Sequence, residues 1–220
     1  MLAPSAPGSL VSTATVYPSI TGGRIWKLVS HGPYLTTQFL SNTIGCAGGF
    51  FPIAGQSPLW ETTTGGHSWS QIALPFPRQF RSYQLTVRRP RVFAHHVFVP
   101  TNLIKSGGSV LLLYRQKIRG KGAWSSGAPL HSTQSVPVTF VNGRQGWAII
   151  HKSSSSWTLM QTTNAGTTSR VVTTLAVPFD IHNIQFVTSR DGWLWSVKTG
   201  VTRSDRFLWR TTDGGHHWQV

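Results

Sequence analysis

Acid–base hydrolysis is the first chemistry to test against this chain, and its carboxylates are few. Enzymes that hydrolyse glycosidic bonds use two carboxyl groups placed on either side of the bond. The 220 residues include 20 Lys and Arg but only five Asp and Glu, namely Glu61, Asp180, Asp191, Asp205 and Asp213. Asp180 and Asp205 are the pair left once the others are assigned to turns or outer strands. We therefore predict a protein that is not an enzyme, with this pair as the candidate that would contradict the prediction.

Histidine and cysteine could instead ligate a metal or act as nucleophiles. Adjacent residues on a strand point to opposite faces, so neither His95-His96 nor His216-His217 would chelate an ion alone. Cys46 is the single cysteine, which excludes an intrachain disulfide and a zinc cluster made of thiolates. The chain also lacks a phosphate-binding loop and a serine nucleophile motif. We expect neither a metal nor a cofactor.

Basic residues are the most abundant chemistry in the sequence. The formal net charge of +15 would attract polyanions or an acidic protein. Arginine can also hold a carboxylate or phosphate through two hydrogen bonds. The candidates for binding a partner or polyanion are Arg78, Arg81, Arg88, Arg89, Arg91, Arg115, Lys117, Arg119 and Lys121. The alternative is a surface that uses arginine only for solubility.

A repeated glycine-rich turn would position all these side chains. Clear copies run from Thr62 to Trp69 and from Thr211 to Trp218, and looser ones span residues 19–26, 117–124 and 162–169. A second anchor, a phenylalanine followed by a turn and an apolar strand, recurs as Phe39, Phe93, Phe140 and Phe186. Two anchors that share one period indicate an internal repeat.

We expect the residues of this turn to be structural. Asp213 can accept backbone N–H groups across the turn, and paired glycines permit backbone angles closed to other residues. The residues assigned to such turns are Asp213, Gly214, Gly215, Trp218, Gly65, Gly66, Trp69, Gly22, Gly23, Trp26, Asn164 and Gly166. The aspartate position is Thr64, Thr21, Asn164 and Arg119 in the other copies, and a catalytic carboxylate would not tolerate such exchange.

The segments between the anchors predict short strands. Apolar runs are bounded by Gly, Ser and Asn, and four strands in about 45–50 residues are the content of one propeller blade. We predict an all-β fold, a partial or small β-propeller of about four to five blades, each a four-stranded antiparallel sheet. Residues 1–18 would be an N-terminal tail or a strand of a preceding blade. Residues 19–220 would hold repeat units at about 19–38, 39–78, 79–130, 131–178 and 179–220.

The segment from Leu208 to Trp218 resembles the Asp-box, or bacterial neuraminidase (BNR) repeat, and residues 19–220 resemble Asp-box β-propellers. That group includes photosystem II stability/assembly-factor-like repeats, sortilin-like domains, sialidases and some glycoside hydrolases. Resemblance to the assembly factors implies a protein that binds a macromolecular partner, and we expect this partner to be another protein; the basic charge is compatible with an acidic one. Resemblance to sialidases implies a glycan-directed protein, active or degenerate, although the required Glu-Tyr pair cannot be found. Polyanion binding through the arginines is the third alternative.

The repeats also raise the question of ring closure. An open arc leaves two uncovered blade faces, so the chain would be a fragment, a small ring, or an arc completed by missing blades or by a partner. Residues 1–10 lack the basic and apolar regions of a signal peptide, and no apolar run approaches the ~18 residues of a membrane span. The compartment is not indicated directly, and the resemblance alone suggests a bacterial extracytoplasmic protein.

Overall fold

The computed structural model describes residues 14–19, 21–51, 54, 56–93, 96–117, 123–153, 156–175, 180–199 and 204–220. Their regular structure is antiparallel β, apart from one short 3-10 helix, η1 (Arg78–Phe80). The predicted all-β class is therefore confirmed. Contacts divide the chain into two compact units, residues 1–90 and 91–220. Within the described part of the chain, no helix has the length and apolar character to cross a membrane.

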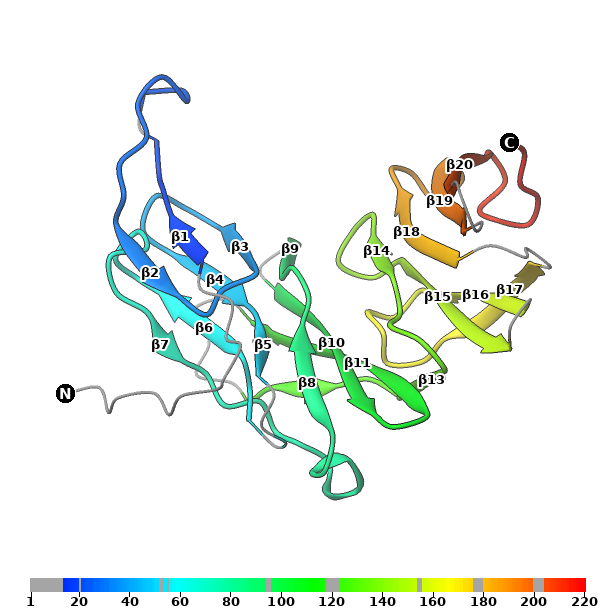
Figure 1. Ribbon diagram of the computed structural model, residues 1–220, viewed down its shortest axis with the longest axis horizontal. Helices are drawn as coiled ribbons and strands as arrows, with labels where there is room; N and C mark the ends of the chain where they lie inside the picture. Colours follow the sequence, from blue (N-terminus) through cyan, green and yellow to red (C-terminus); the bar gives the residue numbers. More distant parts are fainter. Residues whose placement is uncertain are drawn as a thin grey trace. The chain divides into compact units, whose positions relative to one another are not determined.

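The first unit holds a strand pair and a four-stranded sheet (Figure 1). The pair is β1 (Ala14–Val16) and β2 (Ser30–Gly32), and the sheet has the order β3 (Thr36–Phe39), β4 (Gly45–Gly48), β6 (Leu59–Thr62), β7 (Ser70–Gln71). A further pair joins β5 (Phe50–Phe51) to β8 (Gln84–Val87). Val16 of β1 packs against Tyr34, Ala47 and Trp60, so the strand pair covers one face of the sheet.

The second unit contains three groups of strands. A hairpin of β10 (His96–Lys105) and β11 (Gly108–Lys117) is flanked by β9 (Arg91–Phe93), β12 (Ser125–Ser126) and β13 (Leu130–Ser132). Next comes the sheet β14 (Val138–Phe140), β15 (Gly146–Ser153), β16 (Ser156–Thr162), β17 (Arg170–Leu175). The last sheet is β18 (Asp180–Phe186), β19 (Gly192–Thr199), β20 (Ser204–Thr211) (Figure 1).

Three of these sheets share one strand plan, and we call each of them a blade. The first strand ends in a phenylalanine that pairs with a glycine at the start of the second strand, as Phe140 pairs with Gly146 and Phe186 with Gly192. The phenylalanine ring lies over that glycine, where an added Cβ would come within 2.6–2.8 Å of the ring. The third strand ends in a threonine that opens the glycine-rich turn. A fourth strand follows that turn in two of the blades, as β7 and β17, and a single bridge between Gln219 and Arg210 follows it in the last. The repeated anchors are thus the corners of the blades.

Neighbouring blades of the second unit pack face to face. Trp147, Ile149, Trp157 and Leu159 of the β14–β17 blade form one core with Ile181, Ile184, Phe186 and Leu194 of the β18–β20 blade. The rings of Trp147 and Phe186 stack in parallel with centroids 3.9 Å apart. We call the face of a blade that receives the next blade its front face. In the β14–β17 blade, the four residues of this face on β15 and β16 are at most 1% exposed.

Candidate binding surfaces

Four glycine-rich turns are described, and they share the same two hydrogen bonds. The hydroxyl of the first residue accepts the N–H of the second glycine position at 2.9–3.0 Å, in the pairs Ser19/Gly23, Thr62/Gly66, Thr162/Gly166 and Thr211/Gly215. The side chain of the third residue, Thr21, Thr64, Asn164 or Asp213, accepts the N–H four residues later at 2.8–3.1 Å. Hydroxyl, amide and carboxylate oxygens all serve here, so the turn requires an acceptor and not a charge.

The last residue of the turn differs more between copies. The indole N–H groups of Trp69 and Trp218 donate to the backbone carbonyl of the second glycine of the turn, Gly66 and Gly215 respectively, at 3.0 Å. Their rings pack edge-on against the phenylalanine of the same blade. Trp26 is 61% exposed. Ser169 stands where the fourth tryptophan would be, so this turn contributes no ring to Phe140, which packs against Phe98 and Phe93 instead.

Asp213 is occupied by its own turn. It accepts the backbone N–H of His217 at 3.1 Å and the hydroxyl of Thr211 at 2.8 Å, and its other oxygen lies 2.6 Å from His217 Nδ1. The hydrogen bonds from His217, the backbone one first, hold the pKa of Asp213 well below its usual range. This carboxylate therefore stays ionised in acid and has no free oxygen directed at a substrate.

Replacing Asp213 by asparagine should separate the acceptor role from the charge. Asn164 accepts the same N–H in its own turn, so we expect Asp213→Asn to fold with a slightly lower melting temperature. The lowered pKa means that the carboxylate stabilises the fold above its ordinary pKa of 3.8 and loses this effect as the pH falls below it. The melting temperatures of parent and variant, measured from pH 7 to pH 2, should therefore converge below about pH 4. A constant gap down to pH 2 would contradict this account.

The two carboxylates proposed as a pair do not share a face. Asp180 of β18 lies opposite Val197 of β19, whereas Asp205 of β20 lies opposite the adjacent residue Lys198. Because neighbouring residues of a strand point to opposite faces, the two side chains lie on opposite sides of the sheet. Asp191 accepts the Thr188 hydroxyl at 2.7 Å within its loop. This arrangement argues against acid–base chemistry by this pair.

The other polar candidates are also dispersed. Glu61 is exposed on β6, opposite the buried Cys46. Burial, helped by the charge of Glu61, raises the pKa of the Cys46 thiol to about 12, so it stays a protonated and unreactive group at neutral pH. His96 is half-buried on β10, and His95 lies outside the described residues. Over the residues that the structure describes, no three His, Cys, Asp or Glu side chains are grouped to hold a metal ion.

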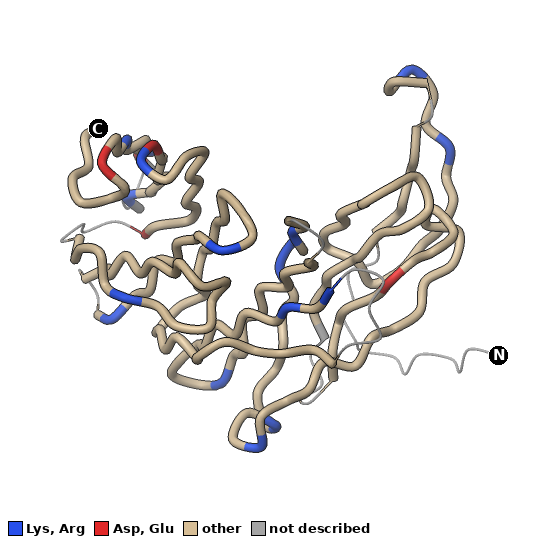
Figure 2. Tube along the Cα trace, turned by 180° about the vertical axis from the view of Figure 1, so that it is seen from behind, with Lys and Arg blue, Asp and Glu red and all other residues tan. Residues whose placement is uncertain are grey.

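The basic candidates fall in both compact units. Arg78, Arg81, Arg88 and Arg89 are exposed in the first unit, whereas Arg91, Arg115 and Lys117 belong to the second. Arg115 donates to Ser125 Oγ at 3.2 Å and to the carbonyl of Asn164 at 3.3 Å. Arg119 and Lys121 lie outside the described residues. No Asp or Glu occurs between Glu61 and Asp180, and Figure 2 shows Lys and Arg at separate places along the trace of each unit.

The front face of the last blade is open to solvent. Register places Trp195 and Leu208 of this blade where the preceding blade has Ile149 and Leu159. Ile149 and Leu159 are 0% exposed beneath the next blade, but Trp195 and Leu208 are 40% and 61% exposed. Arg206, at the position of Trp157, holds its guanidinium 5.9 Å from the Trp195 ring. The ring of His182 lies 5.7 Å from that of Trp195, measured between centroids. The name open face is used below for the surface formed by Trp195, Arg206, Leu208 and His182.

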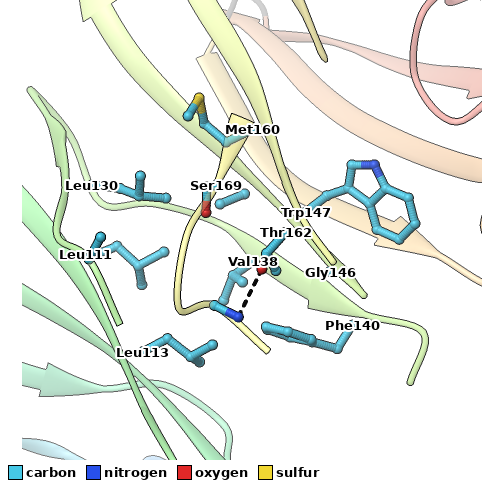
Figure 3. Close-up of a pocket in the computed structure, with 13 residues that line it drawn as sticks. Leu111, Leu113, Leu130, Val138, Phe140, Gly146, Trp147, Met160, Thr162 and Ser169 are labelled. Carbon is cyan, nitrogen blue, oxygen red and sulfur yellow. Dashed lines mark hydrogen bonds between the residues drawn. The ribbon is translucent and has the colours of Figure 1, made fainter. Parts of the chain in front are cut away.

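A second feature is a mostly apolar pocket between β11 and β13 on one side and β14–β16 on the other (Figure 3). Its lining includes Leu111, Ala148, Met160 and Ser169. At the interface between the β14–β17 and β18–β20 blades, larger side chains occupy the corresponding positions. Trp157 corresponds to Leu111, Leu194 to Ala148, Trp209 to Met160 and Trp218 to Ser169. The pocket thus arises because four large side chains are replaced by smaller ones. The hydroxyl of Thr162 in the pocket wall already accepts the N–H of Gly166 (Figure 3). We therefore interpret the pocket as a packing gap and not as a reactive site.

Filling this gap should stabilise the protein. Ser169→Trp would place an indole beside Phe140, as Trp218 lies beside Phe186, and we expect a gain of about 1 kcal/mol in the free energy of unfolding. Urea unfolding followed by circular dichroism measures the change. Ser68→Trp, at an exposed turn position without such a gap, serves as the control and should have no stabilising effect. An equal or negative effect of Ser169→Trp would mean that neighbouring side chains already fill the space.

Comparison with known structures places this architecture among β-propellers. YCF48 from Cyanidioschyzon merolae matches with a TM-score of 0.60 at 15% identity, over 93% of this chain and 63% of that chain. An ulvan lyase of polysaccharide lyase family PL25 matches with a TM-score of 0.51 at 10% identity, over 93% of this chain and 60% of that one. No protein-family model and no curated protein sequence matches the chain. These similarities confirm the propeller fold, and the chain spans less than two thirds of either structure.

The open face was missed by the sequence analysis. Its residues read as ordinary strand positions, because Trp195 and Leu208 are as apolar as their buried counterparts. The available signal was Arg206, which stands where the aligned strand of the preceding blade has Trp157. A charged residue at an otherwise buried repeat position indicates a blade whose front face differs from the others.

Proposed function

We propose that this chain is a non-catalytic β-propeller module that binds a protein partner through the open face. The observation that carries the proposal is the contrast between two equivalent faces. The positions of Ile149 and Leu159 are fully buried by a neighbouring blade, whereas Trp195 and Leu208 have no such cover among the described residues. An exposed cluster of large apolar side chains with a stacked arginine is typical of protein-binding surfaces.

The covered face indicates what the partner should present. Ile181, Ile184, Phe186 and Leu194 cover the front face of the β14–β17 blade with a flat aliphatic and aromatic surface. A partner for the open face would offer a similar apolar β-sheet surface. Arg206 replaces a tryptophan at this face, so the partner surface should also carry a carboxylate opposite it. The net charge of +15 favours an acidic partner as well.

Two other observations support this assignment. The sequence resembles assembly-factor-like repeats, and the fold is similar to that of YCF48, at an identity that supports fold alone. Asp180 and Asp205, the remaining acid–base pair, lie on opposite faces of their sheet. The sequence resemblance and the separation of the two carboxylates favour a binding role over hydrolysis.

Affinity capture from the source cells tests the proposal. The wild-type protein should retain a defined protein that Trp195→Ser/Leu208→Ser loses, while the matched control Val171→Ser/Val220→Ser retains it. That protein, purified, should bind the double variant at least about 30-fold more weakly, because central apolar anchors are each worth about 2 kcal/mol or more. Equal binding by the double variant, or the absence of any protein retained above an unrelated bait, would overturn the proposal.

A glycan-directed role is the second candidate, and one observation favours it. Trp195 with the guanidinium of Arg206 against its ring offers a stacking surface and a cation, the two groups that an anionic polysaccharide would need. Calorimetry with heparin and with ulvan, at rising salt, tests this role. Binding lost in Trp195→Ser would support glycan recognition at the open face. Binding lost only in Arg78→Ala/Arg81→Ala/Arg88→Ala/Arg89→Ala, and steeply reduced by salt, would instead support polyanion binding through charge.

A further inference from the structure

A groove in the first unit lies between β1 and β3. Its volume is about 700 Å³, and its lining includes Val16 and Tyr17 from the β1 segment, Thr37 and Phe39 of β3, and Gly65. The strands β1 and β2 flank a glycine-rich turn, so they correspond to the third and fourth strands of a blade. Among the described residues β1 pairs with β2 alone, and its other edge borders the groove.

The complete blade of the second unit shows which element belongs beside a third strand. There the second strand, β15, pairs with β16 and places Trp147 opposite Gln161. Trp147 stacks on Phe186 of the next blade and donates its indole N–H to the carbonyl of Gly214 at 3.2 Å. Phe39 and Gly65 occupy the corresponding positions of the first unit, as the phenylalanine before the blade's glycine and the first glycine of its turn. Both line the groove.

We propose that this groove binds an extended segment of a partner protein as an antiparallel strand along the edge of β1 that borders it. A tryptophan of that segment stacks on Phe39 and donates its N–H to the Gly65 carbonyl, as Trp147 does with Phe186 and Gly214. Main-chain hydrogen bonds to an exposed sheet edge supply affinity in such complexes, and a pocket for one side chain supplies specificity. The inference rests on the proposed function only in taking the ligand to be a protein.

The rim of the groove supports an aromatic ligand from a protein. Tyr17 and Trp26 line it and are both largely exposed, so they offer apolar area that an inserted strand would cover. Arg24 and Lys27 are exposed in the adjoining turn.

Two peptides provide the test with the full-length protein. The first copies residues 144–153, which form the strand with Trp147, and the second has alanine in place of that tryptophan. In fluorescence anisotropy with labelled peptides, we expect saturable binding of the first peptide and at least about tenfold weaker binding of the second. Absence of saturable binding by the first peptide, or equal binding of both, would overturn the inference.

Variants of the protein locate the binding site. Thr37→Trp fills the groove with an indole from the chain itself and should abolish peptide binding, whereas Thr174→Trp, on an exposed strand of the second unit, should leave it unchanged. Phe39→Leu keeps an apolar side chain and removes the stacking ring, so it should weaken binding even if Thr37→Trp fails to fold. Undiminished binding by Phe39→Leu would overturn the inference. Trp195→Ser/Leu208→Ser should bind the peptide normally, which separates this site from the open face.

Discussion

Replacing Trp147 by alanine should lower the free energy of unfolding by about 3–5 kcal/mol, the usual cost of removing a large buried aromatic side chain. Trp147 is 1% exposed, stacks on Phe186 of the next blade and donates a hydrogen bond to the Gly214 carbonyl. Its loss therefore opens a cavity between two blades and leaves the turn of the second blade without a donor. Urea unfolding followed by far-ultraviolet circular dichroism measures the change without depending on tryptophan fluorescence.

Trp195→Ala is the matched control for this prediction. Trp195 lies on the equivalent strand of the last blade but is exposed, so its removal should cost less than about 1 kcal/mol. Similar losses in the two variants would mean that the open face is covered in solution. In that case, measuring the oligomeric state would show whether a second copy of the chain provides the cover.

Gly215→Ala should destabilise the protein by about 2–4 kcal/mol, and Gly214→Ala by only about 1 kcal/mol. The backbone at Gly215 has a φ of +96°, and an added Cβ would lie 2.3 Å from Leu159 Cδ2 in the core between blades. Gly214 has a φ of +79° and its nearest atom would be the Ser189 carbonyl oxygen at 3.2 Å. Both variants can be compared by thermal and urea unfolding.

The chain contains its own support for this difference between the two glycines. Ala165 occupies the Gly214 position in another turn with a φ of +61°, so this position accepts a Cβ. The Gly215 position is glycine in every described turn, with φ between +79° and +96° at Gly23, Gly66, Gly166 and Gly215. Equal losses for the two alanine variants would show that backbone strain, and not the contact with Leu159, sets the cost.

The local elements of this protein are determined by its sequence. The turn from Thr211 to Trp218 could be predicted because its hydrogen bonds join residues two to four positions apart, so residue type and spacing specify them completely. The pairing of Phe140 with Gly146 and Phe186 with Gly192 is likewise a short-range hairpin. Repetition of these local signals predicted the all-β class and the propeller fold.

Only the tertiary structure decided which surfaces are exposed. Trp195 and Ile149 occupy equivalent strand positions and are both apolar, but burial depends on whether another blade packs above them, and no local pattern contains that information. The separation of Asp180 from Asp205 likewise depends on the register of three strands. The groove beside β1 depends likewise on how β1 and β3, which are about 20 residues apart in the sequence, lie in the fold. Exposure of a strand residue in this protein therefore depends on what packs above it in the tertiary structure, whereas its turns and strands are set by the residues themselves.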